Sequence, residues 1–573
     1  MPIEIPKQPW FTQLYHHWEI TPERVCIRDY ETGKNATFTE FLYDVVKHGE
    51  QLRSQLSEDI QTRLRDPSEE VFITILAAPG YEFAVIVLAI YSIGGIAVPL
   101  RPLIHVEEAK YFMELCNAVY LTTSTTLAPR AREIASALNT NLSIFTPSQK
   151  SAYENTKFIL TPPNTYTEVT NTKATYNPER GFAMLFTSGT TGPPKGVLYS
   201  CGSFTLGTQN YQGTLSLRPS DTWIHQLPVH WKGGFDFFLA AVYAGSCIEF
   251  CSSVFSPEWF WGRMRTGGIS CMLVPPMLLS ALKESLDVIQ ARSSDEFESS
   301  LRGLNEMRFI CTGSLRVPEE MKEVWSGLRG GRQLVNMYGF TEATGMIAMT
   351  DWSDGRGAGK DSCGGCVSGT EVKVDSEGEV CVRGPLLMKR YISTQPDVTK
   401  KAFDSEGFYK TGDTGSIGSD RTLKISGRAS QDIIRFLCRK INAADIEDPL
   451  RQHPAISQAF ILGIDDHHCG QRVAALLITK PNTEGTLKIQ DLRRWLGIDK
   501  QLPAFKLPTL LRAVSQDKFV GMTDSGKPSK KKMRALYFSP EVIKEGGVEV
   551  WDYTLQEEGV GDRPFDWEGC SVK

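Results

Sequence analysis

Short runs of apolar, often β-branched residues recur along this chain and alternate with segments of helical character. Residues 71–79 (VFITILAAP), 271–276 (CMLVPP) and 307–313 (MRFICTG) are three such runs, and residues 318–328 have the pattern of a helix. Runs that are apolar throughout suit strands buried on both faces, which belong to parallel sheets covered by helices. The alternation therefore predicts an α/β fold with mixed or parallel sheets flanked by helices.

One apolar stretch, residues 83–100 (FAVIVLAIYSIGGIAVPL), contains no charged residue. Its length of about 18 residues reaches the lower limit for a membrane-spanning helix. Gly94 and Gly95, however, divide it into a helix-length piece and a short strand-like piece, IAVPL. We therefore expect a buried helix, a glycine turn and a buried strand, and no membrane span.

Charge and cysteine content narrow the class of protein. The chain has 62 Lys and Arg residues against 67 Asp and Glu residues, which argues against a nucleic-acid-binding protein with a basic surface. The 13 cysteines are scattered, odd in number and few for 573 residues, so reduced thiols in a cytoplasmic protein are expected. The N-terminal residues show no basic start followed by an apolar run, so no signal peptide is expected.

Two breaks in the pattern indicate how the chain is organised. Residues 146–178 are polar and rich in Thr, Asn and Pro, as in a loop or linker. A second break lies near residues 413–431, and the pattern after it resembles a compact α+β domain of roughly 140 residues. Length alone allows roughly four domains, whereas the pattern predicts a large domain at residues 1–427 and a small one at residues 428–573.

The strongest local motif is LFTSGTTGPPKGV at residues 185–197, where an apolar strand runs into a loop of Thr, Ser and Gly that ends at Lys195. Glycines let a backbone approach an anion closely, and successive N–H groups and hydroxyls bind phosphate oxygens. The loop is not a Walker A motif, because Lys195 precedes the glycine instead of following it. It predicts a phosphate-binding loop, with a plain surface turn as the alternative.

Two further motifs carry acidic residues. In NMYGFTEATG (residues 336–345) the carboxylate of Glu342 could hold Mg²⁺, and flanking aromatic rings could contact a base. A buried turn in which Thr341 caps a helix explains this motif equally well. In YKTGDTG (residues 409–415) Asp413, at a strand end, could accept hydrogen bonds from ribose hydroxyls, and Arg428 could donate to the same sugar. Taken singly, a turn aspartate and a surface arginine explain these two as well.

Taken together with SGK at residues 525–527, these segments resemble, in order and spacing, the adenylate-forming superfamily, which includes the acyl-CoA synthetases. The resemblance extends over nearly the whole chain. It includes the four further segments GGIAVPLRP (94–102), LPVHWKGG (227–234), VRGPLLMKRY (382–391) and LPAFKLP (502–508). It implies a large N-terminal domain and a small α+β C-terminal lid domain.

The resemblance also implies roles for individual residues. It places the ATP phosphates at Thr187, Ser188, Gly189, Thr190, Thr191, Gly192 and Lys195, and the adenine near Ser314, Tyr338, Gly339, Phe340 and Thr341. Glu342 would hold Mg²⁺, and Asp413 with Arg428 would bind the ribose. Lys527 would be the catalytic lysine of the lid, and His230 would orient the carboxylate or close the acyl pocket.

The implied reaction is the ATP-dependent activation of a carboxylic acid as acyl-AMP, followed by transfer to coenzyme A. One departure concerns the second step. Leu437 and Cys438 stand where relatives have two glycines beside the pantetheine path. This leaves open an adenylating enzyme that serves an acyl carrier protein, or a non-catalytic adenylate-binding protein. Aromatic residues after His230 favour a hydrophobic acid of secondary metabolism.

Overall fold

The chain divides into two compact units. The computed structural model describes residues 2–154, 156–161, 177–187, 194–314, 317–351, 362–428, 432–436, 439–466, 470–481, 483, 485–502, 504–523 and 527–551. The first unit comprises Met1–Val372, Val382–Tyr409 and Gly418–Leu423. The second comprises Lys373–Cys381, Lys410–Ile417 and Lys424–Lys573. A domain boundary between residues 427 and 428 remains a prediction.

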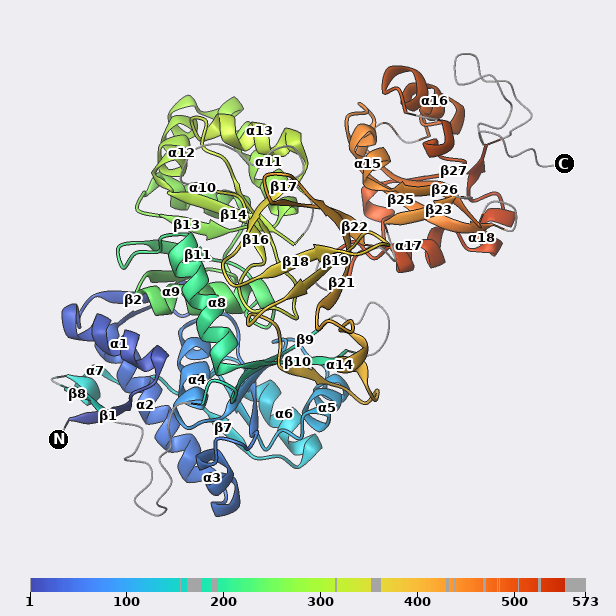
Figure 1. The fold of residues 1–573 in the computed structure, drawn as a ribbon. Helices are drawn as coiled ribbons and strands as arrows, with labels where there is room; N and C mark the ends of the chain where they lie inside the picture. Colours follow the sequence, from blue (N-terminus) through green and yellow to red (C-terminus); the bar gives the residue numbers. More distant parts are fainter. Residues whose placement is uncertain are drawn as a thin grey trace. The chain divides into compact units, whose positions relative to one another are not determined.

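The first unit contains a sheet whose strands are mostly parallel (Figure 1). Its described strands follow the order β20 (Arg390–Ile392), β10 (Gly196–Ser200), β9 (Gly181–Phe186), β5 (Ile96–Pro99), β4 (Phe72–Leu76), β6 (Tyr120–Thr123) and β7 (Leu142–Ile144). Strands β5, β4, β6 and β7 are parallel, whereas β10 is antiparallel to both β9 and β20. The apolar run predicted at residues 71–79 is thus confirmed as a strand of a sheet that is parallel around it.

The apolar stretch at residues 83–100 folds as predicted. It forms helix α4 (Tyr81–Ser92), a turn in which Gly94 has a φ of +85°, and strand β5. Every residue of α4 from Tyr81 to Tyr91 is buried, because the helix packs between the sheet and helix α2 (Phe38–Gln55). Within the described part of the chain, none of the helices combines the length and the apolar character that a membrane span requires.

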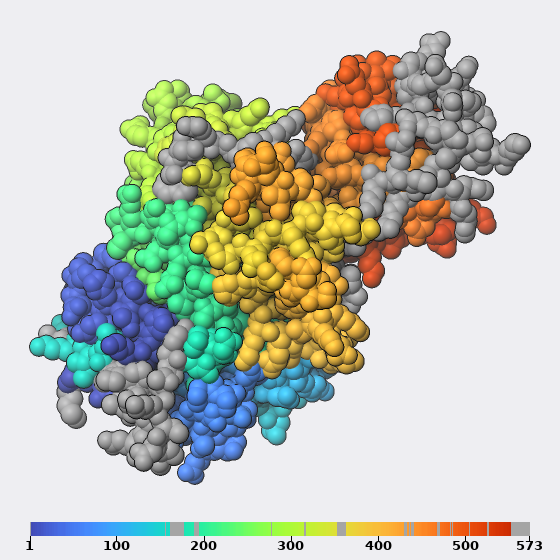
Figure 2. Space-filling view, viewed as in Figure 1, coloured from blue at the N-terminus to red at the C-terminus, as the bar shows by residue number. Residues whose placement is uncertain are grey.

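A second set of neighbouring strands lies in the first unit. Its described order is β17 (Ser362–Cys366), β16 (Ala348–Met349), β15 (Val335–Tyr338), β14 (Phe309–Gly313), β13 (Cys271–Leu273), β11 (Thr222–His225), β12 (Cys247–Phe250), β2 (Val25–Asp29) and β3 (Lys34–Thr37). The strands from β15 to β2 are parallel. Helices α10 (Pro257–Arg265), α11 (Pro276–Arg292), α12 (Ser294–Glu306) and α13 (Glu319–Leu328) accompany them. Figure 2 shows the yellow-green residues of α12 and α13 at the surface.

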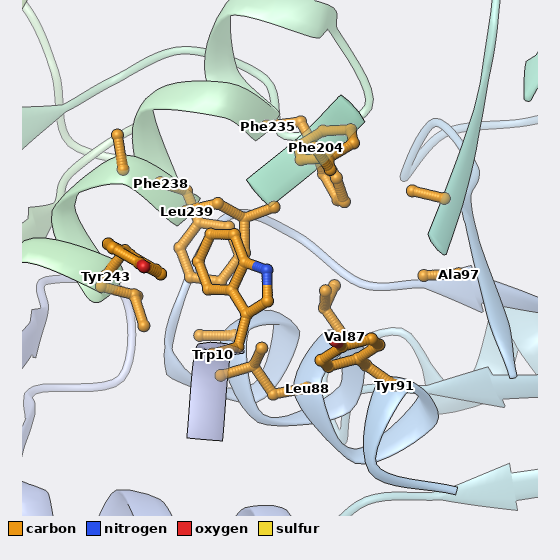
Figure 3. Packing of buried hydrophobic residues seen from close by; sticks show 14 of the residues in the cluster. Trp10, Val87, Leu88, Tyr91, Ala97, Phe204, Phe235, Phe238, Leu239 and Tyr243 are labelled. Carbon is orange, nitrogen blue, oxygen red and sulfur yellow. The ribbon is translucent and has the colours of Figure 1, made fainter. Parts of the chain in front are cut away.

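The core of the first unit gathers around Trp10 of helix α1 (Pro9–Ile20). Its ring stacks on Phe182 at 5.9 Å and meets Tyr243 edge to face at 5.1 Å. Figure 3 shows this indole among side chains of helices α4, α8 (Cys201–Thr214) and α9 (Lys232–Ala244). The core therefore joins the N-terminal helix to three helices from later parts of the chain.

The second unit is α+β. Its described strands β24 (Arg439–Asn442), β23 (Ile433–Phe436), β26 (Gly470–Thr479), β27 (Leu510–Val514) and β28 (Glu549–Val550) are neighbours in that order, and β25 (Ile456–Asp466) also pairs with β26. Helices α15 (Ala444–Arg451), α16 (Ile489–Arg494), α17 (Lys530–Tyr537) and α18 (Pro540–Lys544) accompany them. The whole chain is thus a mixed α/β protein with a smaller α+β C-terminal part, as its sequence predicts.

Two segments read as irregular contain regular structure. The break near residues 413–431 includes strands β21 (Tyr409–Ile417) and β22 (Thr422–Arg428), which are neighbours in a sheet. Their many Gly, Ser and Thr residues concealed a pairing that depends on partners elsewhere in the chain. The polar segment at 146–178 includes a short helix, α7 (Lys150–Tyr153), and strand β8 (Phe158–Thr161), which pairs with β1 (Ile3–Pro6).

Candidate active site

The Thr- and Gly-rich loop connects two antiparallel strands, β9 and β10. The Thr187 N–H donates to the Lys195 carbonyl at 2.9 Å, and the Lys195 N–H lies 3.4 Å from Thr187 Oγ1. Both ends of the loop are therefore held together at the edge of a buried hairpin. The predicted phosphate ligands between them, Ser188, Gly189, Thr190, Thr191 and Gly192, lie outside the described residues.

The Lys195 side chain extends over the ring of Tyr391, with Nζ 5.1 Å from the ring centroid. Tyr391 belongs to β20, and the register of β10 and β20 places it opposite Val197. An ammonium over an aromatic face is attracted by the ring quadrupole. The side chain of Lys195, at one end of the loop, is thus held by Tyr391, a residue far from it in sequence.

Glu342 lies in the turn that follows β15 and approaches the same tyrosine. The Tyr391 hydroxyl donates to Glu342 Oε1 at 2.5 Å, and it lies 3.1 Å from the hydroxyl of Tyr409. The backbone carbonyl of Glu342 accepts from the Met388 N–H at 2.8 Å. Burial, together with the nearby Glu342 charge, raises the pKa of Tyr409, so that this phenol stays protonated. Glu342 is therefore held in place by hydrogen bonds to both its backbone carbonyl and its carboxylate.

Aromatic side chains surround the predicted adenine position. Tyr338 is the buried last residue of β15, and Phe340 stacks on Tyr409 with ring centroids 5.2 Å apart. Thr341 caps no described helix; its carbonyl accepts from the Tyr199 hydroxyl at 2.5 Å. Ser314 is exposed directly after β14 with a φ of +70°. Gly339 is also exposed.

A buried ion pair fixes the end of the same turn. Lys232 and Asp236 lie one helical turn apart on α9, and their side chains pair. Asp236 Oδ2 also accepts from the Gly345 N–H at 3.0 Å. Because the side chain of Asp236 is only 3% exposed, this pair attaches the 336–345 turn to α9, whose first residues follow His230.

His230 lies between β11 and α9. Its Nδ1 is buried and has no hydrogen-bond partner within the described part of the chain. Burial, with a smaller contribution from the Arg101 charge, lowers the pKa of His230 to about 4. The imidazole is therefore neutral at pH 7, and its buried Nδ1 is a polar atom that the described residues leave unsatisfied.

Three of the four aromatic residues predicted after His230 belong to the core, whereas Trp231 is half-buried beside His230. Phe235 and Phe238 are fully buried, and Phe237 is 3% exposed. Phe235 and Phe238 pack edge to face against Phe83, and Figure 3 shows them within the core cluster around Trp10. Core packing accounts for these three phenylalanines, and a hydrophobic acyl substrate remains a prediction.

Asp413 and Arg428 are neighbours in the second unit. Asp413 lies inside strand β21 and not at its end, which corrects the position inferred from the sequence. Arg428 Nε is 2.9 Å from Asp413 Oδ1, and Arg428 Nη1 donates to the Thr411 carbonyl at 2.8 Å. Arg428 therefore orients the carboxylate of Asp413, whose side chain is 9% exposed.

Lys527 is exposed, and its backbone is tied to Thr523 by two hydrogen bonds, of 2.8 and 3.1 Å. Three residues later Lys530 is buried, with Nζ 2.6 Å from Asp432 Oδ1 and 2.8 Å from Glu447 Oε1. Leu437 and Cys438 lie outside the described residues.

The residues around Glu342 fit Mg²⁺ of the kind that bridges phosphates. No group of three or more His, Cys, Asp or Glu side chains gathers as a metal site within the described ranges. Magnesium at nucleotide sites usually takes one or two carboxylates, with phosphate oxygens and water completing the coordination. A single oriented carboxylate, Glu342, is consistent with that donor set.

Sequence reasoning missed three residues of this region, Tyr391, Tyr409 and the buried Lys232. Tyr391 and Tyr409 each lie in a segment that carries the family resemblance, and each is the aromatic residue of that segment. Lys232 and Asp236 lie four positions apart in an otherwise apolar helix, a spacing typical of an ion pair. These patterns are visible in the sequence, but nothing near these residues in sequence indicates which side chains they contact in the fold.

Comparison with known proteins identifies two family models in the chain. The model described as AMP-binding enzyme matches residues 14–392, and the model of the AMP-binding enzyme C-terminal domain matches residues 445–527. The chain is 28% identical to the acyl-CoA ligase oryP of Aspergillus oryzae over 546 residues, which cover 93% of each protein. It is also 28% identical to the malonate–CoA ligase of Arabidopsis thaliana, over 77% of this chain and 74% of that one.

Solved structures share the fold. ATP-bound MatB from Rhodopseudomonas palustris superposes with a TM-score of 0.74 at 20% identity, covering 92% of this chain and 98% of that one. The o-succinylbenzoate CoA synthetase of Bacillus subtilis, in complex with its acyl-adenylate intermediate, gives a TM-score of 0.69 at 20% identity, covering 91% of this chain and 97% of that one.

Proposed function

The chain belongs to the AMP-binding enzyme family, and on that premise we propose how its residues carry out the ATP-dependent ligation of a carboxylic acid to coenzyme A. It is an AMP-forming acyl-CoA synthetase. In the first half-reaction a carboxylate oxygen attacks the α-phosphorus of ATP, and pyrophosphate leaves. In the second, the thiol of coenzyme A attacks the acyl carbonyl, loses its proton, and AMP leaves.

Positioning and charge neutralisation dominate such a reaction, because carboxylate and triphosphate repel one another. Lys195 and the loop from Thr187 bind the phosphates in our proposal, and Phe340 and Tyr338 contact the base. Asp413, oriented by Arg428, accepts from the ribose hydroxyls. Lys527 supplies positive charge to the oxygens that become more negative during adenylation.

Glu342 is our proposed ligand for Mg²⁺, which supplies charge neutralisation on the phosphate oxygens when bound. The hydrogen bond from Tyr391 orients the carboxylate of Glu342 for this role. His230, neutral because its pKa is about 4, orients the acid through a hydrogen bond and adds no fixed charge to the acyl site.

The observation that carries this proposal is the meeting of Lys195 and Glu342 on one side chain, Tyr391. In this proposal the cation, Lys195, binds phosphate and the carboxylate, Glu342, binds the metal ion. The two groups must therefore lie near each other without forming an ion pair. The test is a panel of carboxylic acids, including dicarboxylic and hydrophobic members, scored by pyrophosphate release and by thioester formation. A panel on which no acid releases pyrophosphate with Mg·ATP refutes the assignment of these residues.

The two readouts also separate the possible acyl acceptors. Thioester formation with free coenzyme A supports the ligase as proposed. Pyrophosphate release without a coenzyme A thioester, but with acylation of a carrier protein, supports the alternative that the side chains of Leu437 and Cys438 suggest.

Lys527→Ala provides the test for the catalytic lysine. We expect it to abolish adenylation, while coenzyme A thioester formation from supplied acyl-adenylate survives, because the lysine charge serves only the first half-reaction. Equal loss of both half-reactions would contradict this division of labour. Lys531→Ala, which changes an exposed lysine four positions further along the chain, is the matched control.

A further inference from the structure

Tyr391 lies between two groups of opposite charge. Its ring faces the Lys195 ammonium at 5.1 Å from the centroid, and its hydroxyl donates to Glu342 Oε1 at 2.5 Å. The ring quadrupole attracts the cation, and the hydroxyl makes a charge-assisted bond to the carboxylate. One side chain thus interacts with both charges through different parts of its structure.

Tyr391 is itself held in place. Its backbone is part of β20, paired with β10 immediately after Lys195, and its N–H lies 3.0 Å from Thr399 Oγ1. Its hydroxyl also lies 3.1 Å from that of the buried Tyr409. Either hydroxyl can be the donor in that second contact. The ring position is therefore set by the sheet and by a hydrogen-bonded chain that ends at Glu342.

We propose that Tyr391 is a positioning residue that keeps Lys195 and Glu342 apart, so that neither neutralises the other before the nucleotide binds. The inference rests on the proposed function, in which Lys195 binds phosphate and Glu342 holds Mg²⁺. An ammonium and a carboxylate that met directly would form an ion pair, and each would lose affinity for its own ligand. The ring blocks that contact, and the hydroxyl aims the carboxylate.

Two substitutions separate the ring from the hydroxyl. Tyr391→Phe keeps the ring under Lys195 and removes the bond to Glu342, whereas Tyr391→Leu removes both. ATP binding is measured by calorimetry with Mg²⁺ and with EDTA. The dissociation constant in EDTA divided by that in Mg²⁺ gives the metal dependence. We expect Tyr391→Phe to reduce this ratio by about tenfold, as the loss of a partner behind a metal ligand commonly does, with metal-free affinity unchanged.

Tyr391→Leu should weaken metal-free ATP binding as well, because Lys195 can then pair with Glu342. The matched control is Tyr111→Phe. The Tyr111 hydroxyl donates to the Pro194 carbonyl at 2.9 Å, beside Lys195 in sequence, so its loss should leave the metal dependence unchanged. The unfolding temperature of each variant confirms that the fold is retained.

Glu342→Gln distinguishes failure of the inference from failure of the function. If Glu342→Gln leaves the metal dependence intact, the proposed role of Glu342 is wrong. If Glu342→Gln abolishes it but Tyr391→Phe does not alter it, the function stands and the role of Tyr391 is refuted. Unchanged metal-free affinity in Tyr391→Leu would refute the separation of the two charges.

Discussion

Replacing Lys530 with methionine should destabilise the second unit by removing one cation from a buried cluster. The Lys530 side chain is 7% exposed, that of Glu447 is 11% and that of Asp432 is 25%. Methionine fills a similar volume but leaves both carboxylates without their shared partner. Breaking a buried pair in this way costs about 3–5 kcal/mol, which for a unit of this size lowers the unfolding temperature by on the order of 10 °C.

Thermal unfolding measures the overall loss, and hydrogen exchange locates it. The Ile461 amide donates to Glu447 Oε1 at 2.9 Å, so its exchange should accelerate in the variant. Lys531→Met, at an exposed position of the same helix, should change stability by less than about 0.5 kcal/mol. If Lys530→Met unfolds at the same temperature as Lys531→Met, the cluster does not stabilise the unit and the reasoning is refuted.

The same cluster predicts a pH dependence. Burial opposes the charge on Lys530, but Glu447 and Asp432 outweigh it and raise its pKa. The pKa of a lysine in the unfolded chain is about 10.4. Because the folded-state pKa of Lys530 is higher, its stabilisation is complete below about pH 10.4 and is lost as pH rises through the folded-state pKa. The stability difference between wild type and Lys530→Met should therefore narrow as pH rises into the strongly alkaline range.

Other predictions follow from buried side chains in the first unit. Burial lowers the pKa of His230 to about 4, so its protonation should reduce stability as pH falls from about 6.5, and His230→Gln should remove that component of a stability–pH curve. Trp10→Ala should cost about 3–5 kcal/mol of unfolding free energy, whereas Ile20→Ala, at a 63% exposed position, should cost less than about 0.5 kcal/mol; equal losses would contradict the packing. Burial raises the pKa of Cys271 and Cys311, so both thiols should react with iodoacetamide only after denaturation, as peptide mass spectrometry would reveal.

Much of the local structure could be predicted from residue patterns alone. Residues 83–100 specify a buried helix, a glycine turn and a strand through apolar composition and two glycines. The strand before Thr187 and the turn after Tyr338 were likewise recognisable, because each places small or polar residues directly after a buried apolar run. The order of these motifs along the chain was also sufficient to predict the family, which the two matching family models confirm.

The partners of the functional side chains were decided by tertiary structure. Lys195 and Glu342 meet at Tyr391 because β10 pairs with β20, and that pairing joins residues far apart in sequence. Phe235 and Phe238 looked like pocket residues but are core, since helix α9 turns them toward Phe83. Local sequence determines whether a segment forms a strand, a turn or a helix. Which charges face one another depends on strand register and helix packing, and these arise only when the whole apolar core is buried together.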